Sequence, residues 1–309
     1  MRFMRNLTKE QKVMLERKIE EVLPIIEDIT GLKFKAKPEI EVSWKKPFIT
    51  TVKAFFYLWP AAEGLSPWLN LRTLREGGIA IQYPESNSMW IDPKSGEYLE
   101  SFLIHELVHV LDYQNSTHPV LKIAATTRRE LVPLKYNYQF NLLKALTEGR
   151  ATFLQHFYVQ RDLESVYFNA VRRVEGFKEK KKLLPLDILT HFGSWICLGT
   201  ISGIVSLIPL YYFWTSENIV GVLFSSLLPA AYLFATAKRY NPYMLQLFAK
   251  PIHRLIALDP YSPGLYFMAS VAKEIGVKEA FQITLQNPPS SLEELMEPQR
   301  YVERITRPS

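Results

Sequence analysis

The stretch Ser101-Phe-Leu-Ile-His-Glu-Leu-Val-His-Val-Leu-Asp112 contains a His-Glu-x-x-His pattern formed by His105, Glu106 and His109. Residues four positions apart share one face of a helix, so both imidazoles can meet a single metal ion while the Glu106 carboxylate stands beside them as a base. The apolar residues around the pattern recur at helical spacing, which predicts a buried helix over about residues 96–113. The stretch therefore predicts the core of a zinc-dependent hydrolase.

A third ligand is needed, because a catalytic zinc site of this type combines two histidines with a carboxylate and leaves one position for water. The only cysteine, Cys197, has no partner for a thiolate pair, so the metal must be held by histidine and carboxylate. We predict that Glu148 is the third ligand. It lies on a separate helix expected over about residues 136–158, and its small neighbours Gly149 and Ala151 are expected where that helix approaches the first.

Other acidic residues and histidines are weaker candidates. Glu130 and Asp112 are alternatives for the carboxylate ligand, but Glu130 lacks the small neighbours. Asp112, three positions after His109, is interpreted as polar surface, with support of the metal ligands as the alternative. The remaining histidines share no ligand spacing and are interpreted as surface, structural or interfacial residues: His118, His156, His191 and His253.

The chain before the motif predicts one helix and a small sheet. Thr8 and Gln11 form a capping box, and apolar residues at helical spacing predict an amphipathic helix over residues 8–30. Alternating residues at 32–44 predict one or two strands, and residues 79–83 and 88–92 predict a hairpin that leads into the motif helix. The free edge of this hairpin can pair with an extended peptide, or the hairpin only supports the helix.

Two long apolar stretches predict a membrane hairpin. Residues 195–214 and 219–237 carry no charge, and each is long enough to cross a bilayer as a helix. Basic residues lie on the outer sides of the pair, at Lys178–Lys182 and Lys238–Arg239, which predicts that both ends are cytoplasmic. We therefore expect an integral membrane protein whose catalytic domain faces the cytoplasm, next to the lipid bilayer.

Composition and charge limit the number of domains and the kinds of partner. The chain has 309 residues, of which 48% are hydrophobic, so it can form one large domain or two modest ones. Its net charge of +6 is concentrated beside the apolar stretches and not in an aromatic-interleaved stripe, which argues against nucleic acid as a partner. Charged residues from Lys9 onward leave no room for the apolar core of a cleavable signal peptide.

The motif residues resemble a known family. His105-Glu-Leu-Val-His-Val-Leu-Asp-Tyr-Gln114 resembles the His-Glu-Leu-Thr-His-Ala-Leu-Gln-Asp-Gln stretch of gluzincin-type, thermolysin-like metallopeptidase relatives. Ala145-Leu-Thr-Glu-Gly-Arg-Ala-Thr152 is similar to their Ala-Leu-x-Glu-Gly-x-Ala-Thr, in which the Glu is the third zinc ligand. A third block, which begins at Tyr261-Ser-Pro-Gly-Leu-Tyr-Phe267 and ends near Tyr301, resembles the tail of some members. The resemblance covers roughly residues 75–160 and 258–302.

The chain departs from the family pattern at several positions. Asp112 and Tyr113 replace Gln-Asp, and Thr152 stands where many gluzincins have a carboxylate that supports the first histidine. Glu297 stands where a histidine is expected, so the role of that histidine as an oxyanion donor is not carried over. Tyr261 is a candidate for the oxyanion donor instead, and a core tyrosine is the alternative interpretation.

Together these observations predict an α+β, mostly helical, zincin-like catalytic domain with a small sheet. Residues 1–182 are its first part, residues 183–240 an inserted transmembrane hairpin, and residues 241–309 a second part that packs back on the first. The apolar stretches and the resemblance together imply a membrane-embedded zinc endopeptidase that cuts peptide or unfolded protein, with Zn²⁺ bound by His105, His109 and Glu148 and with Glu106 as general base. The alternative is a catalytically silent membrane adaptor that retains the fold.

Overall fold

The computed structural model describes residues 7–43, 80–83, 87–91, 99–125, 137–180, 256 and 259–307, which are mostly helical and include a small sheet. The coarse fold class predicted from the sequence is thus confirmed. The described helices are α1 (Lys9–Thr30), α4 (Leu99–Asn115), α5 (Pro119–Ala124), α6 (Asn137–Gln160), α7 (Leu163–Lys180), α11 (Tyr261–Ile275), α12 (Val277–Gln286), α13 (Leu292–Met296) and α14 (Pro298–Thr306). The described strands are β1 (Glu39–Ile40), β2 (Ala80–Tyr83) and β3 (Ser88–Ile91).

Helix α1 forms as its sequence predicts. The Thr8 hydroxyl accepts from the backbone N–H of Gln11, while the Gln11 side chain accepts from the N–H of Thr8, so both N-terminal donors are satisfied. The helix continues through Pro24 and ends at Gly31, whose φ of +66° is a left-handed conformation that glycine adopts without strain. Its buried side chains recur at helical spacing and face the core: Leu15, Ile19, Val22 and Ile26.

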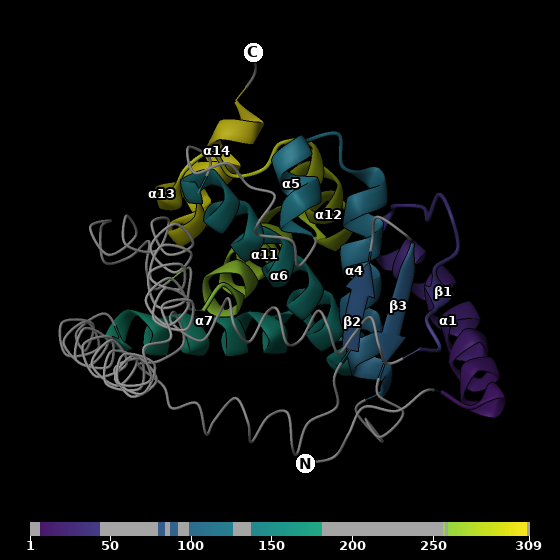
Figure 1. The fold of residues 1–309 in the computed structure, drawn as a ribbon. Helices are drawn as coiled ribbons and strands as arrows, with labels where there is room; N and C mark the ends of the chain where they lie inside the picture. Colours follow the sequence, from purple (N-terminus) through teal and green to yellow (C-terminus); the bar gives the residue numbers. More distant parts are fainter. Residues whose placement is uncertain are drawn as a thin grey trace, which may run out of the picture.

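The sheet has the strand order β1-β3-β2, with β3 in the centre. Strands β2 and β3 are antiparallel, with Ala80 opposite Ile91 and Tyr83 opposite Ser88, so the predicted hairpin is confirmed. The strand predicted within residues 32–44 is only the two-residue β1, which runs parallel to β3. Figure 1 shows helix α4 between this sheet and α1 on one side and α6 on the other.

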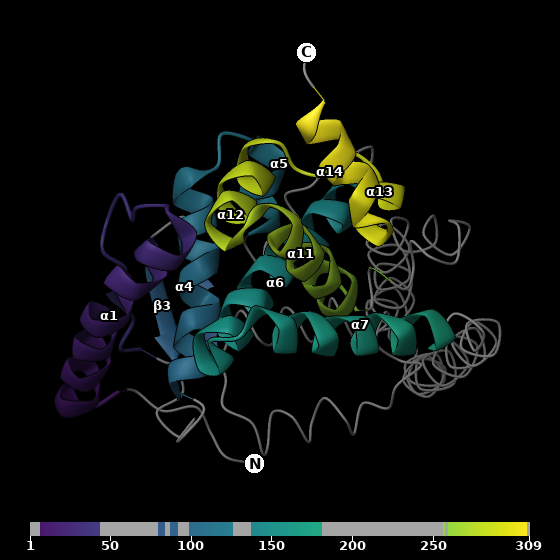
Figure 2. The ribbon, with the colours of Figure 1, turned by 180° about the vertical axis from the view of Figure 1, so that it is seen from behind.

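The segment after residue 259 returns to the core built by the earlier helices. Helix α11 crosses α6 and also packs on α7, as the view from behind shows (Figure 2). At the crossing, a Cβ atom built on Gly149 would lie 2.1 Å from the backbone carbon of Gly264, and one built on Gly264 would lie 1.9 Å from the carbonyl oxygen of Ala145. Only glycine at these positions allows the two backbones to touch.

The structure corrects the prediction of a membrane protein. In the part of the chain that it describes, no helix is both long and apolar enough to cross a bilayer. Even α6, with 24 residues, carries Lys144, Glu148 and Arg150 in its middle. The predicted localisation, integral to the membrane with a cytoplasmic catalytic domain, is therefore wrong by this finding and is not retained. The apolar stretches at 195–214 and 219–237, and with them the hairpin expected at 183–240, lie outside the described residues.

Candidate metal centre

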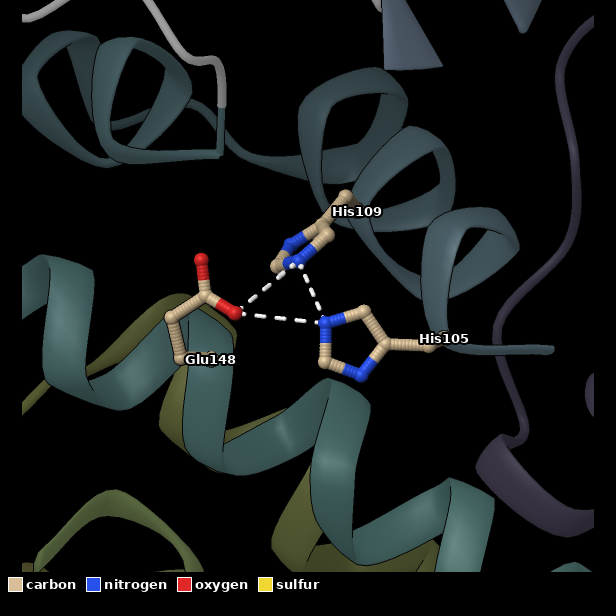
Figure 3. Close-up of side chains that lie close together, drawn as sticks. All are labelled: His105, His109 and Glu148. Atoms are coloured by element: carbon tan, nitrogen blue, oxygen red, sulfur yellow. Dashed lines mark hydrogen bonds and ion pairs between the residues drawn. The ribbon is translucent and has the colours of Figure 1, made fainter. Parts of the chain in front are cut away.

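Two helices bring the predicted ligand residues together. Helix α4 presents His105 and His109 on one face, because the two residues are one turn apart, and α6 presents Glu148 opposite them (Figure 3). The Nε2 atom of His105 lies 3.2 Å from Oε2 of Glu148, and Nε2 of His109 lies 3.4 Å from the same oxygen. The two Nε2 atoms are 3.3 Å apart. All three side chains are largely shielded from solvent.

These three atoms form a triangle that fits a small metal ion. Ligand atoms held about 2.0–2.1 Å from a tetrahedral zinc ion lie roughly 3.3 Å from one another, which is close to the three separations found here. Three electron-pair donors at such distances repel one another unless a cation or a shared proton lies among them. The fold therefore brings together three side chains that could hold a metal ion.

Glu148 is held by a lysine on its own helix. Nζ of Lys144, four residues earlier, lies 2.7 Å from Oε1 of Glu148, which leaves Oε2 directed at the histidines. Burial alone would raise the pKa of Glu148, but the positive charge of Lys144 and the contacts with both histidines outweigh it and hold the pKa well below its ordinary value. The carboxylate therefore stays ionised and available to a cation.

The two histidines differ in their ionisation. Burial lowers the pKa of His109, so its ring is neutral and keeps a free electron pair near neutral pH. Burial also opposes the charging of His105, but the hydrogen bond and negative charge of Glu148 outweigh it and raise the His105 pKa. The Nδ1 atom of His105 contacts Oε1 of Gln155 at 3.2 Å, whereas Nδ1 of His109 has no hydrogen-bond partner among the described residues.

Glu106 lies beside the cluster, and its carboxyl is a weaker acid than that of an ordinary glutamate. Burial raises the pKa of its carboxyl to about 7; the charge of Glu148 adds to this effect, while His105 and Lys144 oppose it. A carboxyl with this pKa can take up and release a proton near neutral pH, which is the requirement for a general acid–base group.

Tyr261 lies at the first residue of α11, next to the same cluster. Its ring centroid is 6.3 Å from that of His105, and its side chain is 45% exposed. The negative charge of Glu148 and partial burial raise the pKa of Tyr261 well above its ordinary value, so the phenol keeps its proton. The start of α11 is fixed by Asp259, whose carboxylate accepts hydrogen bonds from the backbone N–H and the hydroxyl of Ser262 at 3.1 and 2.8 Å.

Asp112 corrects the sequence interpretation. It is not polar surface but fully buried, and its carboxylate accepts two hydrogen bonds from Arg150 on α6, at 2.7 and 2.8 Å. The interpretation of Gly149 changes too, because this glycine allows the approach of α11 and not that of α4. Neither partner could be predicted, because both contacts join residues far apart in the chain.

Two of the other candidates, His118 and Glu297, pair with residues outside the metal cluster. His118 is structural, because its Nδ1 accepts from the backbone N–H of Leu121 at the start of α5. Glu297 lies at the C-terminal end of α13 and pairs with Arg300. His156 on α6 is partly buried. Glu130, His191 and His253 lie outside the described residues.

Two residues that contact the cluster, Lys144 and Gln155, were not predicted from the sequence. Both stand at helical spacing from Glu148, four residues before it and seven after it, so they share its face of α6. This spacing was visible in the sequence. Which of the polar residues on that face reach a ligand depends on how α4 lies against α6, and that was not visible.

The site is therefore a possible metal centre of two histidines and one carboxylate. Its residues lie on two helices that pack on each other in a mostly helical fold. Comparisons with protein-family profiles, with curated proteins and with solved structures found no match for this chain. Function must therefore be argued from the site itself.

Proposed function

We propose that this chain is a zinc-dependent endopeptidase of zincin-like fold, related to the gluzincins, and that it cuts extended or unfolded polypeptide. One observation carries the proposal: Glu106, with its pKa of about 7, adjoins a triangle of His105, His109 and Glu148 whose edges measure 3.2–3.4 Å. A zinc ion would be held by these three side chains.

Zinc is the metal that this donor set favours. Two imidazoles and one carboxylate are the ligands of a common type of catalytic zinc site, whereas calcium and magnesium prefer sites made of oxygen atoms only. The separations suit a tetrahedral ion, and the pattern of ligands leaves one position for water or substrate. When bound, zinc supplies Lewis acidity, which polarises a substrate carbonyl and makes a water molecule more acidic.

Glu106 carries out the proton transfers in this proposal. Its carboxylate accepts a proton from the attacking water as the C–O bond forms, and it then gives that proton to the nitrogen of the leaving amine as the C–N bond breaks. A pKa of about 7 suits both steps, because the group is neither too weak a base to accept the proton nor too weak an acid to release it.

Tyr261 is the candidate donor to the developing oxyanion. Its phenol is protonated, stands beside His105 and is partly open to solvent, so a substrate can reach it. A donor fixed before the reaction stabilises negative charge that appears only in the transition state. This role fits the absence of the family histidine, whose position is taken by Glu297.

The substitution Glu106→Gln tests the proposal. Wild type and variant should bind zinc equally well, because Glu106 is not a ligand, but only the wild type should cleave a fluorescently labelled unfolded protein. Glu175→Gln is the matched control, since Glu175 is exposed on α7 and should leave cleavage unchanged. Cleavage by Glu106→Gln at the wild-type rate would remove Glu106 as the base. A zinc-loaded wild type that cleaves nothing would favour a silent binding protein.

A further inference from the structure

The ring of His105 is contacted by α6 through both of its nitrogen atoms. Glu148 faces Nε2 at 3.2 Å, and Gln155 faces Nδ1, also at 3.2 Å. The two α6 residues are seven positions apart, which is two helical turns, so they point from the same face of the helix toward α4. His105 is therefore held between two side chains of one rigid element.

The side-chain amide of Gln155 is itself fixed by a third residue. Its Nε2 donates a hydrogen bond to the hydroxyl oxygen of Ser101 at 2.6 Å, and Ser101 lies one turn before His105 on α4. This bond turns the carbonyl oxygen, Oε1, toward the imidazole. A carbonyl oxygen can only accept a hydrogen bond, so it places a proton on Nδ1, and in the neutral ring with that proton Nε2 keeps its electron pair.

Gln155, and not Thr152, contacts the ring of His105. In many of the gluzincins that the motif resembles, a carboxylate at the position of Thr152 supports the first histidine. Here the Thr152 side chain is buried, and its hydroxyl has no hydrogen-bond partner in the described part of the chain. Gln155, one turn further along α6, is the residue that reaches the ring.

We propose that Gln155 is a positioning residue for the metal centre: together with Ser101 it selects the His105 tautomer whose Nε2 can bind a metal ion, and it fixes the plane of the ring. The inference rests on the proposed function, because it assumes that the cluster binds zinc. Residues that orient a metal-binding histidine typically change metal affinity by about 10- to 100-fold when they are removed.

The test compares zinc affinities of the full-length chain by competition with a chromophoric chelator. Gln155→Leu removes the acceptor and should weaken zinc binding by about 10- to 100-fold. Gln155→Glu restores an acceptor at the same place and should return the affinity to the wild-type value or above it. Gln160→Leu, at the exposed end of α6, is the matched control and should bind as the wild type does.

Ser101→Ala, on helix α4, tests the same role of Gln155 with a second variant. It leaves Gln155 intact but frees its amide to rotate, so it should weaken zinc binding less than Gln155→Leu does. This variant keeps the inference testable if Gln155→Leu fails to fold. Thermal unfolding of the metal-free chains separates the two effects, because a positioning role predicts similar unfolding temperatures for all variants in the absence of zinc.

The outcomes separate this inference from the proposed function. If the wild type binds no zinc, the proposed function fails. If the wild type binds zinc and Gln155→Leu binds it equally well, only the role of Gln155 is overturned. If Gln155→Glu is as weak as Gln155→Leu, the residue acts by packing and not as an acceptor, which also overturns the inference.

Discussion

The guanidinium of Arg150 and the carboxylate of Asp112 form a bidentate ion pair in which both side chains are fully buried. Arg150 belongs to α6, two residues after Glu148, and Asp112 belongs to α4, three residues after His109. The same guanidinium donates to the carbonyl oxygen of Phe281 and the hydroxyl of Thr284 on α12. One buried cation thus joins the two ligand-bearing helices to the C-terminal part of the core.

Removal of Arg150 should destabilise the fold strongly. Arg150→Met leaves the Asp112 charge buried without a partner, which typically costs about 3–5 kcal/mol. The double variant Asp112→Leu, Arg150→Met removes both charges and should recover a large part of that loss. Denaturant unfolding measures both effects, with Arg172→Met on the exposed face of α7 as control. Equal midpoints for Arg150→Met and wild type would show that the ion pair does not hold the helices together.

The contact between α6 and α11 gives a prediction about glycine. Gly264→Ala would place a methyl group 1.9 Å from the Ala145 carbonyl oxygen, so the helices must separate, and we expect a loss of at least about 2–3 kcal/mol or failure to fold. Gly176→Ala is the matched control, because a Cβ at that exposed position of α7 meets nothing within 4 Å. It should stabilise the chain by about 0.5–1 kcal/mol. Similar unfolding midpoints for the two variants would contradict the backbone contact.

The acidity of Glu106 predicts a pH-dependent stability. Its pKa rises from an ordinary value of 4.5 to about 7 in the folded chain, so the folded state binds the proton more tightly. The contribution of Glu106 to the free energy of unfolding should therefore fall as the pH rises from 4.5 to about 7 and then stay low. In metal-free Glu106→Gln this side chain does not ionise. The free energy of unfolding of the variant should therefore exceed that of the wild type by up to about 3 kcal/mol above this pH range.

The control for this experiment is Glu175→Gln, which removes an exposed carboxylate on α7 and leaves Glu106 in place. Chemical unfolding across the pH range gives the difference between Glu106→Gln and wild type. The difference should shrink toward zero below pH 4.5, where both states of the wild-type carboxyl are protonated. A difference that does not change with pH would mean that Glu106 titrates normally.

Tyr261 should affect turnover and not metal binding. Loss of one oxyanion donor typically lowers kcat by about 10²- to 10³-fold, so Tyr261→Phe should lose activity by that order while it keeps KM and zinc content near the wild-type values. Tyr113→Phe is the control, because it keeps the ring under the Lys122 ammonium and lies on α4 outside the ligand triangle. Unchanged kcat in Tyr261→Phe would assign Tyr261 a packing role.

Local patterns predicted the parts of the structure that depend on neighbouring residues. The capping box at Thr8, the hairpin before α4 and the shared face of His105 and His109 all follow from spacings of two to four residues. Glu148 was predicted as the third ligand because of its small neighbours and because of the family resemblance. Geometry of this kind is set by backbone periodicity, which a sequence displays directly.

Partners far apart in the chain were not predictable in the same way. Asp112 was interpreted as polar surface, but its partner Arg150 lies 38 residues away in the chain. Gly264 belongs to the Tyr261–Phe267 block of the family resemblance, but the resemblance did not reveal that this glycine contacts the backbone of α6. The uncharged stretches at 195–214 and 219–237 predicted a membrane protein, but no helix in the described part of the chain is long and apolar enough to cross a bilayer.

Zinc analysis of the purified chain shows whether His105, His109 and Glu148 bind one metal ion, on which the proposed function depends. Wild type from zinc-replete cells should contain about one zinc per chain, and X-ray absorption should show two imidazole nitrogens and a carboxylate oxygen as its protein ligands. His109→Ala should remain folded and lose most of this zinc. A folded wild type without zinc, or a His109→Ala variant that keeps the full amount, would contradict the account.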